Sequence, residues 1–272
     1  MFGEVAATYD RVRPGYPDEL FERIFSYAGL APGGGARLVE CGAGTGKATM
    51  GYARRAAEAG WSLTCVEPDE EMAAVLSGHL SGVPGLSSSV VVRGFEDFAA
   101  GEVGEGFSLL LAAQCWHWLS PEHRAGAAAA VLRPGGTLAL VWNVARAHDE
   151  PLRSELGAAY RSILPEWGGG APASPTSPQP YAAGLTEEAR RRYVVELEAT
   201  GLFTRPRSES VTWTSRHGTE EWLAVLETHS DHRMLEPETR RRLLQAVRDV
   251  VTANGDRVDV VYDTVAVLAR RA

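Results

Sequence analysis

The stretch of this chain that decides its fold is R-L-V-E-C-G-A-G-T-G-K-A-T, residues 37–49. Its first residues end a short apolar run that is typical of a buried strand, and the residues after Gly46 have the composition of a helix. Glycine stands at three alternate positions between them. Small residues let the backbone pass against a ligand, and a helix N-terminus presents unpaired N–H groups to it. The pattern therefore predicts a nucleotide-binding turn.

The glycine spacing and an acidic neighbour argue against a dinucleotide. In the pyrophosphate fingerprint the third glycine lies three residues after the second, but here the gap is two. Glu40, at the strand tip, would repel a pyrophosphate and attract a cationic amino-acid tail. An NAD(P)-dependent oxidoreductase remains the less favoured alternative.

This segment resembles the first motif of class I S-adenosylmethionine (SAM) methyltransferases, an acidic residue followed by G-x-G-x-G. In that family the loop wraps the methionine part of SAM. The resemblance therefore implies that SAM is the cofactor. It also implies cofactor contacts from Glu40, Gly42, Ala43, Gly44, Thr45 and Gly46.

A second acidic residue follows the next predicted strand, residues 61–66. Glu67 lies about twenty residues past the glycine turn, where an acid meets a ribose diol in nucleotide-binding α/β folds. A carboxylate can accept both hydroxyl protons of that diol; the alternative is an exposed helix-capping acid. Pro68 comes next, and Met72 is expected either against an adenine face or in the core.

A third strand is predicted over residues 89–93, followed by Gly94, Phe95 and Glu96. The resemblance implies that this loop touches adenine. The family often has an aspartate where this chain has Gly94, so we expect the Phe95 backbone N–H to serve there instead.

A continuous apolar run at residues 107–113 is typical of a central parallel strand that is buried on both faces. It ends in Q-C-W-H-W, residues 114–118. Ligands in such sheets bind beyond the carboxyl ends of the strands, so this cluster is expected to wall the site. The resemblance extends to this string, which is similar to the A-x-x-x-H-W segment of methyltransferases that act on small acids and metabolites, the trans-aconitate methyltransferase group among them.

Within this cluster Gln114 is expected beside the cofactor, and Trp116 and Trp118 beside the substrate. His117 is the candidate catalytic base because an imidazole with a pKa near 6.5 suits proton transfer. The alternative is that His117 only orders the aromatic wall or binds substrate.

The N-terminal segment Y-D-R-V-R-P-G-Y-P, residues 9–17, contains the end of one predicted helix and the P-G-Y-P break, residues 14–17, that separates it from the next. It is similar to the start of many small-molecule methyltransferases, which implies a lid with Tyr9 and Arg13 on the cofactor and Tyr16 on the substrate. A helical pair that only covers a sheet edge is equally compatible with the pattern. Asp18 is expected to cap the second helix.

The remaining chain completes the expected α/β fold: a Rossmann-like, seven-stranded, mostly parallel sheet with an antiparallel C-terminal strand, capped by the N-terminal helices and an insertion. Strands are predicted at 137–142, 209–214 and 257–270, and the R-P-G-G turn precedes the first of them. Residues 1–143 would form the SAM-binding core and lid. Residues 144–208 would form an insertion with a Pro- and Gly-rich loop at 164–184, and residues 209–272 would complete the sheet and the cavity.

Four further substrate residues are expected from the later segments. A T-x-S segment near position 228 resembles one that the same group places against the substrate cavity. The predicted residues are Asn143, Trp222, Thr228 and Ser230.

Composition limits the class of partner. The chain has 272 residues and a formal net charge of −8, which argues against a non-specific nucleic-acid binder. No apolar run approaches the ~20 residues that span a bilayer, and three scattered cysteines predict neither a disulfide framework nor a metal site. We expect a cytoplasmic monomer or homodimer that methylates a small molecule. The alternatives are a non-catalytic SAM-binding protein and a SAM enzyme of other chemistry.

Overall fold

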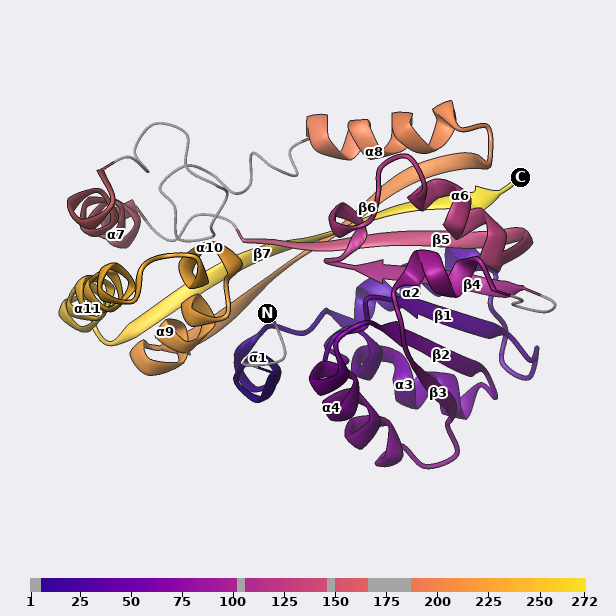
Figure 1. Ribbon diagram of the computed structural model, residues 1–272, viewed down its shortest axis with the longest axis horizontal. Helices are drawn as coiled ribbons and strands as arrows, with labels where there is room; N and C mark the ends of the chain where they lie inside the picture. The colour runs from indigo at the N-terminus through magenta and orange to yellow at the C-terminus, as the bar shows by residue number, and fades with distance from the viewer. Residues whose placement is uncertain (1–5, 102–105, 146–149, 166–186) are drawn as a thin grey trace.

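The computed structural model describes residues 6–101, 106–145, 150–165 and 187–272. Seven strands form one sheet in the order β3-β2-β1-β4-β5-β7-β6 (Figure 1). The strands are β1 (Arg37–Cys41), β2 (Ser62–Glu67), β3 (Ser87–Val92), β4 (Phe107–Ala113), β5 (Leu132–Ala145), β6 (Phe203–Gly218) and β7 (Arg257–Arg271). The first five strands pair in parallel, and β7 lies antiparallel between β5 and β6. The predicted fold class is confirmed.

Helices cover both faces of this sheet. The helices of the core are α2 (Asp18–Ala28), α3 (Thr49–Glu58), α4 (Glu70–Ser81), α5 (Phe95–Ala99), α6 (Arg124–Val131) and α8 (Glu187–Ala199). On one face α2, α3 and α4 pack on the sheet through Phe25, Tyr52 and Leu76. On the other face α6 and α8 contribute Ala128 and Leu197. The sheet is thus a buried middle layer, as a doubly wound fold requires.

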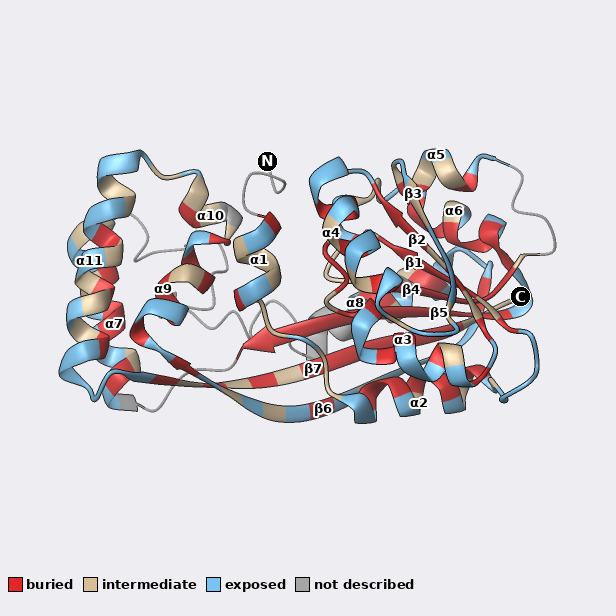
Figure 2. Ribbon diagram, turned by 90° about the horizontal axis from the view of Figure 1, so that it is seen from below, coloured by how far each residue is buried: buried red, intermediate tan, exposed pale blue. Residues whose placement is uncertain are grey.

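A cap is built on the far ends of β6 and β7, which run 16 and 15 residues and extend beyond the rest of the sheet (Figures 1 and 2). It consists of α1 (Ala6–Val12), α7 (Glu150–Ile163), α9 (Thr219–Glu227), α10 (Ser230–Arg233) and α11 (Pro237–Ala253). Trp222, Leu243 and Val260 share one hydrophobic cluster there with Val12 of α1. The cap therefore faces the carboxyl end of β5, where ligands bind in such sheets.

Three local predictions need correction. Asp18 is the first residue of α2 and not its cap, because Pro17 occupies the N-cap position; its charge still favours the helix start. Strand β6 is much longer than 209–214, because it pairs with β7 from Gly218 to Phe203. Its polar residues hide that length, as is common on an edge strand. The R-P-G-G turn lies within β5, where the pairing register with β4 shifts.

The remaining expectations are only partly covered. Most of the predicted loop at 164–184 lies outside the described residues. The three-part division of the chain stays a prediction; β5 crosses its first boundary. None of the helices in the described ranges is long and apolar enough to cross a membrane.

Candidate functional site

The glycine turn between β1 and α3 has the left-handed backbone that its sequence suggests. Gly42, Gly44 and Gly46 have φ of 59°, 58° and 92°. A Cβ would stand 2.7 Å from Cys115 at Gly42 and 2.7 Å from Leu76 at Gly46, whereas at Gly44 it would meet nothing within 4 Å. Packing therefore requires the outer two glycines, while the middle one leaves its side of the backbone open.

Glu40 is buried at the tip of β1 and holds the helix that follows the turn. Its Oε2 accepts hydrogen bonds from Thr49 Oγ1 at 2.9 Å and Tyr52 Oη at 2.6 Å. Burial raises the pKa of Glu40 from its ordinary value of 4.5 to about 7, against the two hydrogen bonds that lower it. The predicted contact between Glu40 and the cofactor's ammonium stays a prediction. What the structure shows is a carboxylate that joins β1 to α3.

Glu67, at the tip of β2, is bonded to the glycine turn itself. Its Oε2 accepts the Gly44 N–H at 2.8 Å, and its Oε1 accepts the Asp69 N–H at 3.0 Å. Asp69, and not Glu67, caps α4, by accepting the N–H groups of Glu71 and Met72. Glu67 therefore lies beside the turn, as the ribose role requires, and its alternative role as a capping acid is excluded.

The third predicted cofactor loop is turned partly toward the protein. Gly94 is the N-cap of α5, and the side chain of Phe95 is buried. Glu96 Oε1 accepts the Ser120 N–H at 2.9 Å, and so anchors the segment that follows Trp118. The adenine contacts of this loop stay a prediction.

A cavity of about 170 Å³ opens where β4 and β5 end. The cap and the sheet both contribute to its wall. It is lined by Tyr9, Arg13, Pro14, Tyr16, Lys47, Gln114, His117, Trp118, Asn143, Ala145, Val225, His229 and Tyr262. Seven of the predicted site residues thus come together in one place.

Long-range hydrogen bonds hold this wall in shape. Asn143 Nδ2 donates to the Gly15 carbonyl at 2.8 Å, and its Oδ1 accepts from Thr264 Oγ1 at 2.6 Å. Gln114 has a φ of 57°, and its Nε2 donates to the Asn143 carbonyl at 3.0 Å. A left-handed backbone at a non-glycine residue persists only where its surroundings fix it. The polar wall is therefore part of a connected hydrogen-bond network.

Two histidines line the cavity. Burial, and then the positive charge of Arg124, lower the pKa of His117. Burial, Arg13 and His232 hold the pKa of His229 well below its ordinary value. Both imidazoles are therefore neutral at pH 7, which is the form that accepts a proton.

Arg124 of α6 anchors the segment that carries His117. Its guanidinium donates to the Trp116 carbonyl at 3.0 Å and to both oxygens of Glu196 in α8, at 2.7 and 2.5 Å. A bidentate pair of this kind fixes geometry as well as charge. The three-residue turn Trp116–Trp118 is thereby held at the mouth of the cavity.

Other predicted residues do not line the cavity. Trp116 and Trp222 are fully buried in hydrophobic clusters, and Met72 is a buried residue of α4. Thr228 is buried behind the wall, and Pro68 is exposed. The side chain of Ser230 lies outside what the structure describes. These two tryptophans belong to the core. The sequence could not show this, because an aromatic residue suits the wall of a site and a hydrophobic cluster equally well.

Six residues that line the cavity were not among the predicted site residues, and the polar ones are Lys47, His229 and Tyr262. Lys47 directly follows the last glycine of the turn, so its place beside the site could have been inferred from that position. Tyr262 gives no such signal, because it belongs to a strand with ordinary alternation. The place of His229 at the cavity likewise depends on contacts far away in sequence.

The fold and this site together define a class of protein. Class I SAM-dependent methyltransferases share three features with this chain. These are a doubly wound sheet with an antiparallel last strand, a glycine turn after β1 and an acid at the tip of β2. Residues 39–140 match the sequence family described as "Methyltransferase domain".

Relatives agree with this class. An uncharacterized methyltransferase of Mycobacterium tuberculosis is 36% identical over 142 residues, 52% of this chain and 51% of the relative. One from Schizosaccharomyces pombe is 30% identical over 138 residues, 51% of this chain and 50% of the relative. The match with this chain thus spans about half the length of these curated relatives.

A solved structure from Anaeromyxobacter dehalogenans, described as a type II methyltransferase, has the same fold. Its TM-score is 0.61 at 20% identity, over 95% of this chain and 97% of that one. A Bacillus subtilis protein gives a TM-score of 0.50 at 12% identity, over 94% and 99% of the two chains. The chain thus shares the fold of these solved structures, and residues 39–140 are similar to a methyltransferase domain, which supports SAM as the cofactor.

The raised pKa of Glu40 predicts a pH-dependent stability. The folded pKa of about 7 lies above the ordinary 4.5, so the protonated form stabilises the fold below about pH 4.5. That stability is lost as the pH rises through 7. Glu40→Gln keeps both accepted hydrogen bonds and should be more stable than the wild type by about 3 kcal/mol at pH 8, and by under about 1 kcal/mol at pH 5.

Urea unfolding at the two pH values measures this difference. Glu58→Gln, at an exposed position of α3, is the matched control and should show no such trend. An equal stability difference at both pH values, or a Glu40→Gln protein less stable at pH 8, would contradict the assignment.

The second prediction concerns cofactor affinity. Glu67→Ala should weaken binding of S-adenosylhomocysteine by about 2–4 kcal/mol, because two charge-assisted hydrogen bonds to the ribose are lost. Calorimetric titration measures it, with Glu70→Ala as a control that removes the same charge from an exposed neighbour. An unchanged affinity would remove Glu67 from the cofactor site.

Proposed function

We propose that this protein transfers a methyl group from SAM to a small-molecule acceptor. SAM would bind at the glycine turn, and the acceptor would bind in the cavity. The observation that carries the proposal is that the glycine turn and the cavity lie next to each other. Lys47 and Gln114, which line the cavity, directly follow the glycine turn and β4. The crevice of a doubly wound sheet opens at this point, where β1 and β4 lie side by side and the chain leaves in opposite directions.

The turn itself fits SAM. Gly44 has an open Cβ side, so a ligand can approach the backbone there. Thr45 Oγ1 is buried without a hydrogen-bond partner among the described residues, an atom that a bound polar group would satisfy. Residues 42–46 would hold the methionine part, and Glu67 the ribose. The cap would exclude water from the acceptor, because residues of α1 and α9 form part of the cavity wall.

The chemistry asked of this chain is mainly positioning. SAM supplies a methyl group that is already activated by its sulfonium. The cavity residues would hold the acceptor atom in line with that methyl group, about 3–3.5 Å away. His117 would take a proton where the acceptor is a neutral hydroxyl, since its lowered pKa keeps the imidazole neutral at pH 7.

A non-catalytic SAM-binding role is the second candidate, and the cavity argues against it. A cavity plugged by Trp116 or Trp118 would favour a binding module. Trp116 is instead buried in the core, and Trp118 is 64% exposed at the rim. An open polar cavity beside the cofactor cleft is what an enzyme needs. The relatives above carry methyltransferase names, which adds support. A cytoplasmic location, a monomer or homodimer, and the absence of nucleic-acid partners belong to the same proposal.

The acceptor can be found by mass spectrometry of cell extract incubated with the protein and methyl-labelled SAM, which should yield a labelled small molecule. With that acceptor, His117→Ala should lower kcat about a hundredfold or more if His117 is the base. His117→Gln keeps a hydrogen bond but cannot transfer the proton, so it should be equally slow. Full kcat in His117→Gln, with only KM raised, would assign His117 to substrate binding.

A further inference from the structure

Two cationic side chains, Arg13 and Lys47, line the cavity, and no Asp or Glu is among the described residues that line it. This is unusual in a chain with a formal net charge of −8. Asp10, the acid next to them in α1, is engaged by His79 Nε2 at 2.8 Å. The cavity therefore has the opposite charge to the molecule as a whole.

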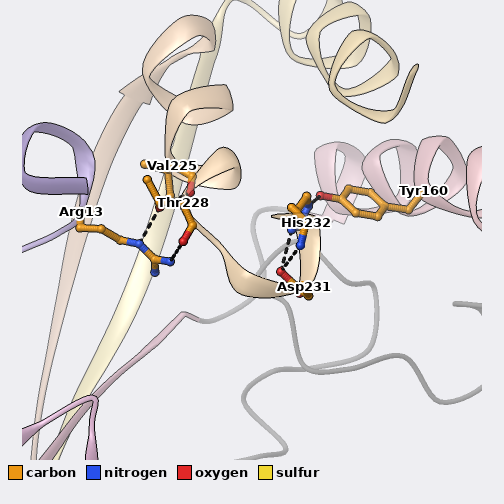
Figure 3. A network of polar contacts seen from close by, with 6 residues as sticks. All are labelled: Arg13, Tyr160, Val225, Thr228, Asp231 and His232. Atoms are coloured by element: carbon orange, nitrogen blue, oxygen red, sulfur yellow. Dashed lines mark hydrogen bonds and ion pairs between the residues drawn. The ribbon is translucent and has the colours of Figure 1, made fainter. Parts of the chain in front are cut away.

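Arg13 is held in place from the cap side, as Figure 3 shows. Its Nε donates to Thr228 Oγ1 at 2.7 Å, and its Nη2 donates to the Thr228 carbonyl at 3.0 Å. Neither acceptor is charged, and Nη1 has no partner within the described part of the chain. The guanidinium is thus oriented by neutral groups, and its charge is not balanced by a carboxylate.

Lys47, on the sheet side of the cavity, is also a cation that forms no ion pair with a described carboxylate. It is half-buried, and burial lowers its pKa. Across the described residues no carboxylate lies within ion-pair distance of its ammonium group. The charge of Asp10, which is bonded to His79, acts against burial and raises the pKa of Lys47. A partly desolvated cation with no carboxylate in direct contact costs free energy, which an anionic ligand would offset.

His229 adds a neutral donor between two anchored residues. Thr228 before it holds Arg13, and His232 after it is fixed by Tyr160 Oη at 2.7 Å and by Asp231 Oδ1 at 2.8 Å (Figure 3). The imidazole of His229 lines the cavity and has no hydrogen bond within the described ranges. Its lowered pKa leaves it neutral, with one ring N–H to donate.

Tyr262 completes this donor set from β7. Burial raises the pKa of its phenol to about 12, so its O–H is present at every physiological pH. The cavity wall therefore offers cations and neutral donors from four segments: the residue after α1, the residue after the glycine turn, the α9–α10 connection and β7.

We propose that Arg13, Lys47 and His229 form an oxyanion subsite, which takes an ionised oxygen of the acceptor. This inference rests on the proposed function, because it treats the cavity as the acceptor site. The ligand class is a small acceptor with a phenolate, enolate or carboxylate group. Its size follows from the volume of about 170 Å³, which is close to that of an engineered cavity of about 150 Å³ that admits benzene.

The methionine carboxylate of SAM is the other source of such an oxyanion. It would occupy the cations from the cofactor side and leave none for the acceptor. The two sources can be separated by saturating the cofactor site with S-adenosylhomocysteine, which carries the same carboxylate.

The test uses 4-nitrophenol as a probe of the protein saturated with S-adenosylhomocysteine. Its visible absorbance reports the ionised form. The apparent pKa of the bound probe should fall by about one to three pH units, because opposite charges lie close to its oxygen. 4-Nitroanisole, which has the same ring but no ionisable oxygen, should bind at least about tenfold more weakly at pH 8.

Arg13→Gln and Lys47→Gln should each remove most of this fall in the probe's pKa, and His229→Gln should reduce it. Arg11→Gln is the matched control. It removes the same charge from an exposed position in the last turn of α1, two residues before Arg13, and should leave the result unchanged. If Arg13→Gln fails to fold, Lys47→Gln decides the matter alone.

Three results would overturn the subsite: no binding of 4-nitrophenol, an equal affinity for 4-nitroanisole, or a pKa fall that persists in both charge variants. Probe binding that disappears on addition of S-adenosylhomocysteine would also overturn it, since the cations would then serve the methionine carboxylate. Failure of S-adenosylhomocysteine itself to bind would instead refute the proposed function.

Discussion

The hydrogen bond from the Gly44 N–H to the Glu67 carboxylate is the constraint on which the site depends. It joins the glycine turn to the tip of the neighbouring strand, while Glu40 joins the strand before the turn to the helix after it, through Thr49 and Tyr52 of α3. Two carboxylates with raised pKa values thus fix the middle of the turn and the two elements that flank it. A loop fixed in this way presents its backbone without having to reorganise when a ligand binds, which favours affinity.

The cap depends on a different constraint, the length of the antiparallel pair β6 and β7. Because these strands extend past the parallel part of the sheet, they carry α9, α10 and α11 to the same end where β1 and β4 release their loops (Figure 1). Arg13 then bonds Thr228, 215 residues away, and closes the cap on the N-terminal helix. The glycine turn is therefore local to the sheet, whereas the cavity wall needs residues of both the sheet and the cap.

This division explains how much the sequence could predict. The glycine turn, the position of Glu67 and the order of strands follow from local patterns: glycine spacing, apolar runs and strand-then-helix alternation. The cavity wall does not, because it is made by contacts such as Asn143 with Gly15 and Thr264. Periodicity shows which side of an element is apolar but not which distant element it meets.

The errors have the same physical origin. Trp116 and Trp222 stand at sequence positions where a substrate wall was expected. A large aromatic side chain suits a buried core as well as a substrate wall, so the residue type does not distinguish the two. Lys47 was passed over as the start of a helix, although α3 begins only at Thr49 and leaves that side chain at the cavity.

The central claim is that one cleft holds SAM with its methyl group directed into the cavity, and a crystal structure of the protein with S-adenosylhomocysteine tests it most directly. The account predicts the methionine part along residues 42–46, the ribose hydroxyls on Glu67, and the sulfur atom facing the cavity wall that carries Arg13 and His117. A ligand bound elsewhere, or one whose sulfur faces away from that cavity, would contradict it.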